Sequence, residues 1–203
     1  MSPAEKFIKA LPADMYEMVD NSNKRRPTIK LTQGIRFATG WIKLQELRFS
    51  KLPVDIDSSC NLTILHTKLT SLVGIPLLVK GRLWIDAGFL SLEELNTQVE
   101  DVVFLASSKL TSLNKISKNI HSVSGGVITF DAPIQSHILD LLRVVGLQQV
   151  EISPNARLIK NTERQSLSTA FAIINNHLNT EERDVLSCQQ ELIAAGLKEF
   201  AKL

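Results

Sequence analysis

The chain has 203 residues, 44% of them hydrophobic and 22% charged, with a formal net charge of +2. This composition is ordinary for a soluble globular protein and excludes a strong overall electrostatic field. The two cysteines, Cys60 and Cys188, have no CxxC spacing, which argues against a disulfide framework or a structural zinc site and favours the cytoplasm. We expect no signal peptide, and no apolar run reaches the roughly 18 residues of a membrane span.

The first ten residues predict a helix. Ser2 is a good N-cap, Pro3 suits the first helical position, and Glu5 lies in the first turn. Residues 12–19 are expected to continue this helix or to form a second turn. We assign residues 1–44 to an N-terminal helical cap followed by a basic segment.

The basic segment, residues 21–51, contains eight lysine or arginine residues and a single acidic residue, Glu46. Such a segment is typical of surfaces that hold phosphates or an acidic protein face. Its candidate phosphate-binding residues are Lys24, Arg25, Arg26, Lys30 and Arg36. No nucleic-acid fold signature accompanies it, and a solvated basic edge is the commoner interpretation.

A repeat follows the basic segment. The pentapeptide KLTSL occurs at residues 68–72 and again at residues 109–113. Three segments, beginning at Leu62, Leu83 and Val103, fit the pattern L-x-L-x-x-(T/G/S)-x-L, at spacings of 21 and 20 residues. Weaker copies are found at residues 47–49, 128–130 and 150–152.

This spacing predicts stacked parallel strands. In L-x-L, both apolar residues point to one side of a short strand, which cannot bury that side alone. Stacking turns of about 20 residues buries these sides in one continuous core. The fold class is therefore α/β, with a short, irregular solenoid over residues 45–153.

The repeat resembles that of leucine-rich-repeat proteins, and residues 69–85 are similar to the LTSL-x-G-x-P repeats of small tailed-phage proteins. The resemblance implies a concave strand face that docks a partner protein. Thr67, Gly88 and Ser108 stand where the family has an asparagine that ties successive turns by hydrogen bonds. We therefore expect a shorter and less regular solenoid than a horseshoe.

Residues 154–203 predict a helical hairpin. A first helix begins at Asn161 or Thr162, and a second follows Thr180. The apolar stripe of the second contains Leu186, Ile193, Leu197 and Phe200. The apolar face of the first helix contains Leu167, Phe171, Ile174 and Leu178. The hairpin is interpreted either as a cap on the solenoid or as a partner-binding arm. Residues 132–146 are also expected to be helical, on the outer side of the last repeats.

The sequence contains few signs of a catalytic or metal-binding site. The sequence contains no phosphate-binding loop, zinc-protease motif or nucleophile elbow, and its four histidines are scattered. The pair Asp55 and Asp57 is interpreted as solvated turn chemistry rather than as a catalytic pair. We therefore predict no enzymatic activity, no catalytic residue, no metal and no cofactor.

The strand residues that face away from the core are the candidate binding surface. Trp84 and Phe104 are expected as neighbours about 5 Å apart, the spacing of adjacent strands. An alternative is that the helices or the N-terminal segment cover these rings as a secondary core. The predicted partner-binding residues are Arg48, Thr63, Leu65, Trp84, Asp86, Phe104, Thr129 and Asp131.

These observations favour a protein–protein interaction module. If the phage resemblance holds, its role is that of a phage factor which binds and inhibits a host protein or defence system in the host cytoplasm. The alternatives are a nucleic-acid-binding protein that uses residues 21–51, or a structural component of the virion. The sequence specifies neither the partner nor the oligomeric state.

Overall fold

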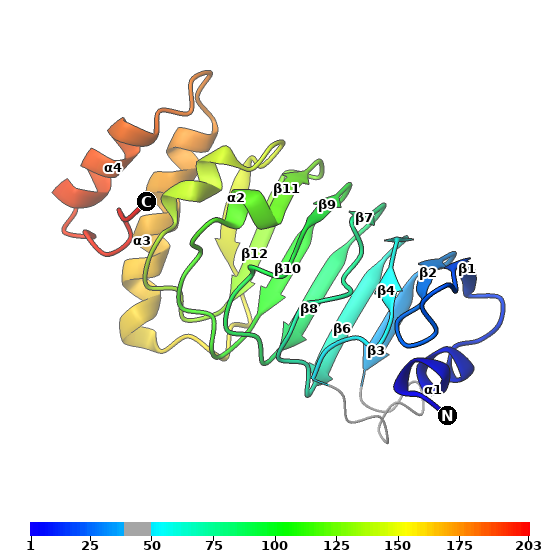
Figure 1. Cartoon of the computed structure of the whole chain (residues 1–203). Coiled ribbons are helices and arrows are strands. Elements are labelled where there is room, and N and C mark those ends of the chain that lie inside the picture. Colours follow the sequence, from blue (N-terminus) through cyan, green and yellow to red (C-terminus); the bar gives the residue numbers. More distant parts are fainter. Residues whose placement is uncertain (39–49) are drawn as a thin grey trace.

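The computed structural model describes residues 1–38 and 50–203. The protein is a mixed α/β structure in which parallel strands form a solenoid of about four turns (Figure 1). The larger sheet has six strands in the order β13-β12-β10-β8-β6-β3. Their bounds are β3 (Ile35–Ala38), β6 (Leu62–Thr67), β8 (Leu83–Ala87), β10 (Val103–Ala106), β12 (Val127–Asp131) and β13 (Gln149–Ile152).

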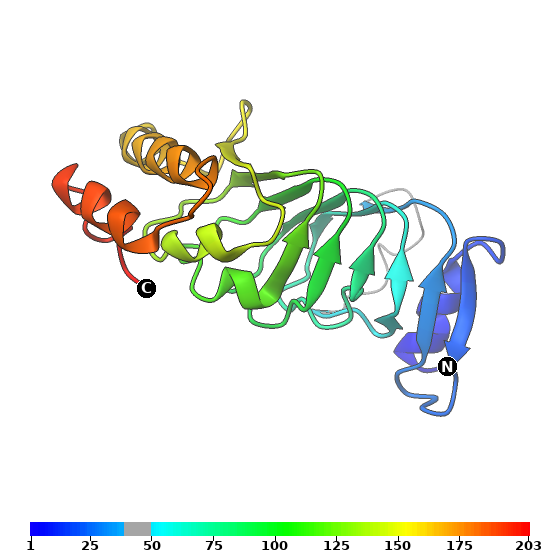
Figure 2. The ribbon, with the colours of Figure 1, turned by 90° about the horizontal axis from the view of Figure 1, so that it is seen from above.

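A second parallel sheet lies on another side of each turn, as Figure 2 shows from above. It has four strands in the order β11-β9-β7-β5, and each one precedes its partner in the larger sheet along the chain. Their bounds are β5 (Ser58–Ser59), β7 (Leu78–Val79), β9 (Thr97–Val99) and β11 (Ile120–Val123).

The N-terminal end begins with helix α1 (Pro3–Ala10), whose N-cap is Ser2 as predicted, and Ser2 and Glu5 form a capping box. A three-stranded sheet follows, with β1 (Tyr16–Asp20) antiparallel to β2 (Thr28–Leu31) and β2 parallel to β4 (Asp55–Ile56). The expectation of helix over residues 12–19 is therefore wrong. Leu11 is extended, as the residue before a proline prefers, and the chain then enters the β1–β2 hairpin.

The strand register confirms the repeat. Leu62 pairs with Leu83, and Leu83 with Val103, so the three well-matched copies occupy adjacent turns. The weaker copies at residues 128–130 and 150–152 follow in register. At its other edge, β6 pairs with β3, so the strand that precedes residues 62–67 in the sheet consists of residues 35–38. The predicted upstream copy at residues 47–49 lies outside the described part of the chain.

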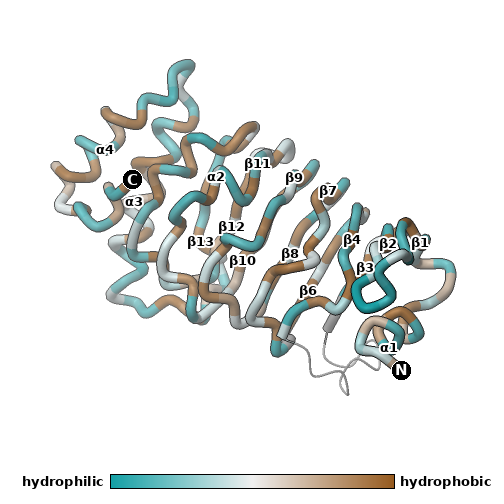
Figure 3. Tube along the Cα trace, viewed as in Figure 1, coloured by the Kyte–Doolittle hydropathy of each residue, from teal (hydrophilic) through white to brown (hydrophobic). Residues whose placement is uncertain are grey.

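The core is a stack of aliphatic side chains between the two sheets. The first and third residues of each L-x-L motif are at most 1% exposed in β6, β8 and β10. Burial of each such side chain stabilises the fold by roughly 1.5–3 kcal/mol. The repeated pentapeptide has the same cause, because both leucines of each KLTSL copy are buried. Figure 3 shows the hydrophobic positions recurring from turn to turn.

One position of the predicted repeat is wrong. Phe89 is fully buried, whereas Leu90, the expected core residue, is 68% exposed. The ladder between β6 and β8 shifts by one residue, from Leu65 opposite Asp86 to Thr67 opposite Ala87. This bulge inserts one extra residue in β6, so that Leu69 corresponds to Phe89 instead of Leu90.

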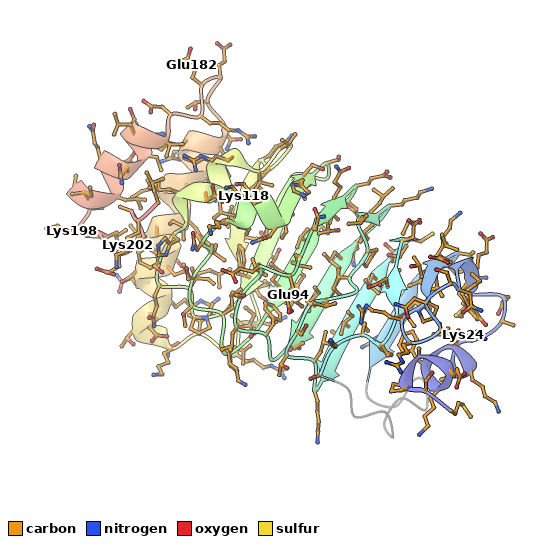
Figure 4. The ribbon with its side chains drawn as sticks, viewed as in Figure 1. Lys24, Glu94, Lys118, Glu182, Lys198 and Lys202 are labelled. Carbon is orange, nitrogen blue, oxygen red and sulfur yellow. The ribbon has the colours of Figure 1, made fainter. Side chains whose placement is uncertain are left out.

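Several side-chain ties between successive turns lie outside the three positions where the family has an asparagine. Asn61 Oδ1 accepts a hydrogen bond from the Arg82 backbone N–H at 2.8 Å, and the buried Ser107 hydroxyl donates to the Phe89 carbonyl at 2.6 Å. A carboxylate oxygen of Glu94 similarly accepts from the Leu72 N–H at 2.7 Å (Figure 4). The ties therefore differ from turn to turn, which fits an irregular solenoid.

The C-terminal part is helical, with the short helix α2 (Ile116–Asn119), the 3-10 helix η2 (Leu139–Arg143), and the helices α3 (Asn161–Leu178) and α4 (Val185–Ala194). The four predicted apolar residues of α3 are all buried. In contrast, the helix expected over residues 132–146 is only the five-residue η2. No helix among the described residues is long and apolar enough to cross a membrane.

Helix α4 begins later than the sequence suggests. Its N-cap is Asp184, which accepts hydrogen bonds from the backbone N–H groups of Leu186 and Ser187. Two residues of the predicted stripe, Leu186 and Ile193, are exposed, whereas Cys188 and Leu192 form the buried face of α4. Phe200, also predicted in the stripe, is buried beyond the end of the helix. A cap at Thr180 is therefore wrong, because its hydroxyl donates to nearby backbone carbonyls instead.

Candidate functional site

The predicted column of outward-facing strand residues exists. Thr63 pairs with Trp84, Trp84 with Phe104, Phe104 with Thr129, and Thr129 with Glu151. The position expected of Arg48 belongs to the exposed Arg36, which pairs with Thr63. Arg48 itself lies outside the described residues. We call the outward-facing residues Thr63, Trp84, Asp86, Phe104 and Thr129 the ring surface.

The two aromatic rings of the ring surface are in direct contact. The ring centroids of Trp84 and Phe104 are 4.4 Å apart, with a tilt of 38° between the ring planes. Both side chains are half-buried. A tilted pair at this distance contributes about 0.5–1.5 kcal/mol beyond the burial of its area. The indole N–H of Trp84 is buried and has no hydrogen-bond partner among the described residues, an uncommon state for a buried donor.

The two ends of the column differ in charge. At the β13 end, Thr129 Oγ1 donates to a carboxylate oxygen of Glu151 at 2.7 Å, and Gln149 Nε2 lies 3.4 Å from the other oxygen. At the opposite end, Arg36 is exposed. The column therefore has the cationic Arg36 at one end and the hydrogen-bonded carboxylate of Glu151 at the other, with the two aromatic rings between them.

A second column is formed by the residues that directly follow each L-x-L motif, and it offers less surface than the first. Leu65, Ala106 and Asp131 are each at most 8% exposed. The carboxylate of Asp131 accepts hydrogen bonds from the backbone N–H groups of Arg157 and Leu158, at 3.0 and 2.9 Å. Asp131 therefore holds the segment after β13 in place. Of the predicted partner-binding residues in this column, only Asp86 is half-exposed.

The predicted phosphate-binding residues do not form one group. The guanidinium of Arg26 donates to Asp55 Oδ1 at 2.8 Å from Nε and to the Leu52 carbonyl at 2.8 Å from Nη1. This contact fixes Arg26 within the fold, and it also pairs one member of the Asp55–Asp57 pair with a cation. Lys24 and Arg25 are exposed in the loop between β1 and β2, where Figure 4 marks Lys24.

The ionisable and nucleophilic groups bear on whether the protein can bind a metal or form a covalent bond with a substrate. The described ranges 1–38 and 50–203 contain no group of three or more His, Cys, Asp or Glu side chains that could hold a metal ion. His177 contacts Glu191 at 2.9 Å, and His137 Nδ1 lies 3.0 Å from the Ser112 hydroxyl. Burial raises the pKa of the Cys188 thiol to about 12, which makes it a poor nucleophile.

One cavity was not anticipated. It has a volume of about 190 Å³ and lies where β2, β5 and the end of β7 meet. It is lined by Lys30, Leu31, Thr32, Ser58, Ser59, Cys60 and Lys80, which we call the lysine cavity. No local motif marks it, because its two lysines belong to different turns. Of its lining residues, Lys30 alone was among the predicted phosphate-binding residues.

Comparisons with family models, with curated proteins and with solved structures gave no significant match.

Proposed function

We propose that the protein is a non-enzymatic interaction module that binds a partner protein on the ring surface. The observation that carries this proposal is the Trp84–Phe104 pair, with centroids 4.4 Å apart on a half-exposed sheet face. Aromatic side chains are over-represented among residues that dominate binding energy at protein interfaces. Thr63 and Thr129 flank the pair along the column and supply hydroxyl groups at its rim.

The rigidity of the strands that carry the two rings also supports binding at the ring surface. The rings extend from β8 and β10, which are paired on both edges inside the six-stranded sheet. Side chains on such strands lose little conformational entropy when a partner binds, so more of the contact energy appears as affinity. The buried indole N–H of Trp84 is a donor that a small rotation would present to a partner's carbonyl.

The narrower form of the proposal follows the sequence resemblance. It describes a leucine-rich-repeat-like solenoid with a concave strand face, encoded by a phage and acting on a host protein in the cytoplasm. The LTSL repeats support it. In this description α1 and the α3–α4 hairpin are end caps, a role supported by the packing of α3 against the terminal strand β13.

Site-specific photo-crosslinking tests the proposal. A photoreactive phenylalanine analogue at position 104 is expected to capture one protein from cell extract, and Trp84→Ala is expected to reduce capture about tenfold or more. An analogue at exposed Leu77, which precedes β7 in the other sheet, serves as the matched control. Capture that is equal at positions 104 and 77, or unchanged by Trp84→Ala, would contradict the proposal. A thermal melt of each variant separates lost binding from lost folding.

A further inference from the structure

We propose that the lysine cavity binds a small tetrahedral oxyanion, either free phosphate or sulfate or the phosphate group of a small molecule. The site is separate from the ring surface and does not depend on the function proposed for that surface. Its elements are a buried hydroxyl without a partner, two lysines from different turns, and a volume suited to a small ion.

Parallel stacking brings the two lysines to one place. Lys30 lies on β2, whereas Lys80 directly follows β7, and β5 with Ser59 lies between them. The Lys80 backbone N–H donates to the Ser59 carbonyl at 2.9 Å, which continues the β5–β7 ladder and sets the position of Lys80 beside Ser59. The relative position of Ser59 and Lys80 is thus determined by backbone hydrogen bonds, and Lys30 lines the same cavity from β2.

The hydroxyl of Ser59 is the strongest sign of a ligand. Ser59 is 2% exposed and lines the cavity, yet its Oγ has no hydrogen-bond partner among the described residues. Leaving a buried hydroxyl unsatisfied costs about 1–3 kcal/mol, so such groups in folded proteins usually have a bound partner. The neighbouring Cys60 thiol donates to the Thr32 carbonyl and the Thr32 hydroxyl donates to the Asp14 carbonyl, so neither hydrogen is directed at Ser59.

The charges around the cavity select an anion. The Lys30 ammonium has an acidic neighbour, Glu17, at 3.8 Å, which is longer than a hydrogen bond, and Lys80 is an exposed lining residue of the cavity. Two ammonium groups and one hydroxyl are all hydrogen-bond donors. A ligand that satisfies them must therefore accept several hydrogen bonds and carry negative charge, as a phosphate oxygen cluster does.

The volume limits the size of the ligand. A cavity of about 190 Å³ is smaller than the roughly 300–1,000 Å³ of pockets that hold drug-sized ligands. A water molecule in the liquid takes about 30 Å³, so the cavity has room for a tetrahedral ion with a few waters. A whole nucleotide does not fit within this space.

Alkylation of Cys60 gives a direct readout of occupancy. Cys60 is a half-buried wall residue of the cavity, whereas Cys188 is fully buried, so neutral iodoacetamide should label Cys60 selectively. Potassium phosphate is expected to slow this labelling in a saturable way, relative to potassium chloride at the same ionic strength. Peptide mass spectrometry measures the labelling rate at each cysteine, and titration calorimetry measures the affinity independently.

Phosphate binding by substituted proteins tests whether the ion binds in the lysine cavity. Lys80→Gln should weaken phosphate binding about tenfold, the usual size of a lost charge-assisted hydrogen bond. Ser59→Ala should weaken it as well, while Lys109→Gln, at an exposed lysine elsewhere, and Trp84→Ala should leave it unchanged. Because Lys80 is exposed, its variant is expected to fold even if Ser59→Ala does not.

The source of the ligand is resolved by parallel titrations with phosphate, sulfate and glycerol phosphate. Saturable binding of any of the three that Lys80→Gln weakens supports the site, and the tightest ligand identifies the source. Equal labelling in phosphate, sulfate, glycerol phosphate and chloride would overturn the proposal. So would binding that Lys80→Gln leaves unaltered.

Discussion

The side-chain amide of Asn175 makes two hydrogen bonds to the backbone of Val150: its Oδ1 accepts from the N–H at 2.7 Å and its Nδ2 donates to the carbonyl at 2.8 Å. Val150 lies on β13, the last strand of the six-stranded sheet, whose outer edge has no further strand. Asn175, on α3, therefore takes the place of the next strand at this point. Such an edge would otherwise leave backbone groups unpaired.

Asn175→Ala is expected to destabilise the protein by about 1–3 kcal/mol, because it leaves the backbone groups of Val150 without their partners. Asn176→Ala, at the exposed neighbouring position on the same helix, is the matched control and should change stability by less than about 0.5 kcal/mol. Urea unfolding measures both. Equal effects of the two substitutions would show that the amide contributes nothing beyond helix propensity.

The bulge in β6 leads to a second prediction. Phe89→Ala should cost about 3–5 kcal/mol, because it removes a fully buried ring and leaves a cavity. Leu90→Ala, one residue later at a position that is 68% exposed, should stay within about 0.5 kcal/mol. Chemical denaturation of the pair tests the register directly. If Leu90→Ala proved the more damaging change, the repeat would continue through β8 without the bulge.

Substitution of the adjacent residues Arg25 and Arg26 should affect the thermal stability differently. Arg26 donates to Asp55 and to the Leu52 carbonyl, so Arg26→Ala is expected to lower the melting temperature. Arg25 is exposed and its variant should melt like the wild type. If residues 21–51 bind nucleic acid, Arg25→Ala is the informative binding variant, because it changes charge without loosening the fold. A salt-dependent gel shift with both variants distinguishes these roles.

The N-cap of α4 should make stability depend on acid pH. The Ser187 hydroxyl, followed by the backbone N–H of the same residue, lowers the pKa of Asp184 by hydrogen bonding to its carboxylate. A lowered pKa in the folded state means that this contribution is present above the ordinary aspartate pKa and is lost as the pH falls through the lowered value.

Ser187→Ala removes the largest cause of that shift, so the pKa of Asp184 should rise toward its ordinary value. Carboxyl NMR titration of Asp184 in both proteins measures the change. Asp184→Asn retains a good N-cap residue but cannot titrate, so its stability should vary less between neutral and acid pH than that of the wild type. An Asp184 titration that is the same with and without Ser187 would refute the assignment.

Local sequence patterns predicted several elements correctly. Ser2, Pro3 and Glu5 indicated α1, and the capping box forms because both of its partners lie within one helical turn. The apolar spacing of Leu167, Phe171, Ile174 and Leu178 indicated α3. These predictions succeed because helix signals depend on residues three or four positions apart. The start of α4 was missed, since both Thr180 and Asp184 are suitable caps and tertiary packing selects between them.

The candidate sites were predictable to different degrees. The alternation in L-x-L placed Trp84 and Phe104 outward, and equal register in β8 and β10 then made them neighbours. The hydrogen bonds from the backbone of residues 157–158 to the Asp131 carboxylate could not be predicted from the sequence. They depend on the path of the chain after β13. The lysine cavity was not predicted as a site, because Lys30 on β2 and Lys80 after β7 are far apart in the sequence. Only the folded chain brings them to one place.

The sequence by itself determined that the chain stacks parallel strands at 62, 83 and 103, because strictly alternating aliphatic residues at near-constant spacing can bury their apolar side only against copies of themselves. Only the tertiary structure decided which strand precedes residue 62, where the bulge moves Phe89 inward, how Asn175 pairs with the open edge, and which polar groups surround Ser59. Those features depend on contacts between residues far apart in the chain, and no local pattern encodes such distances.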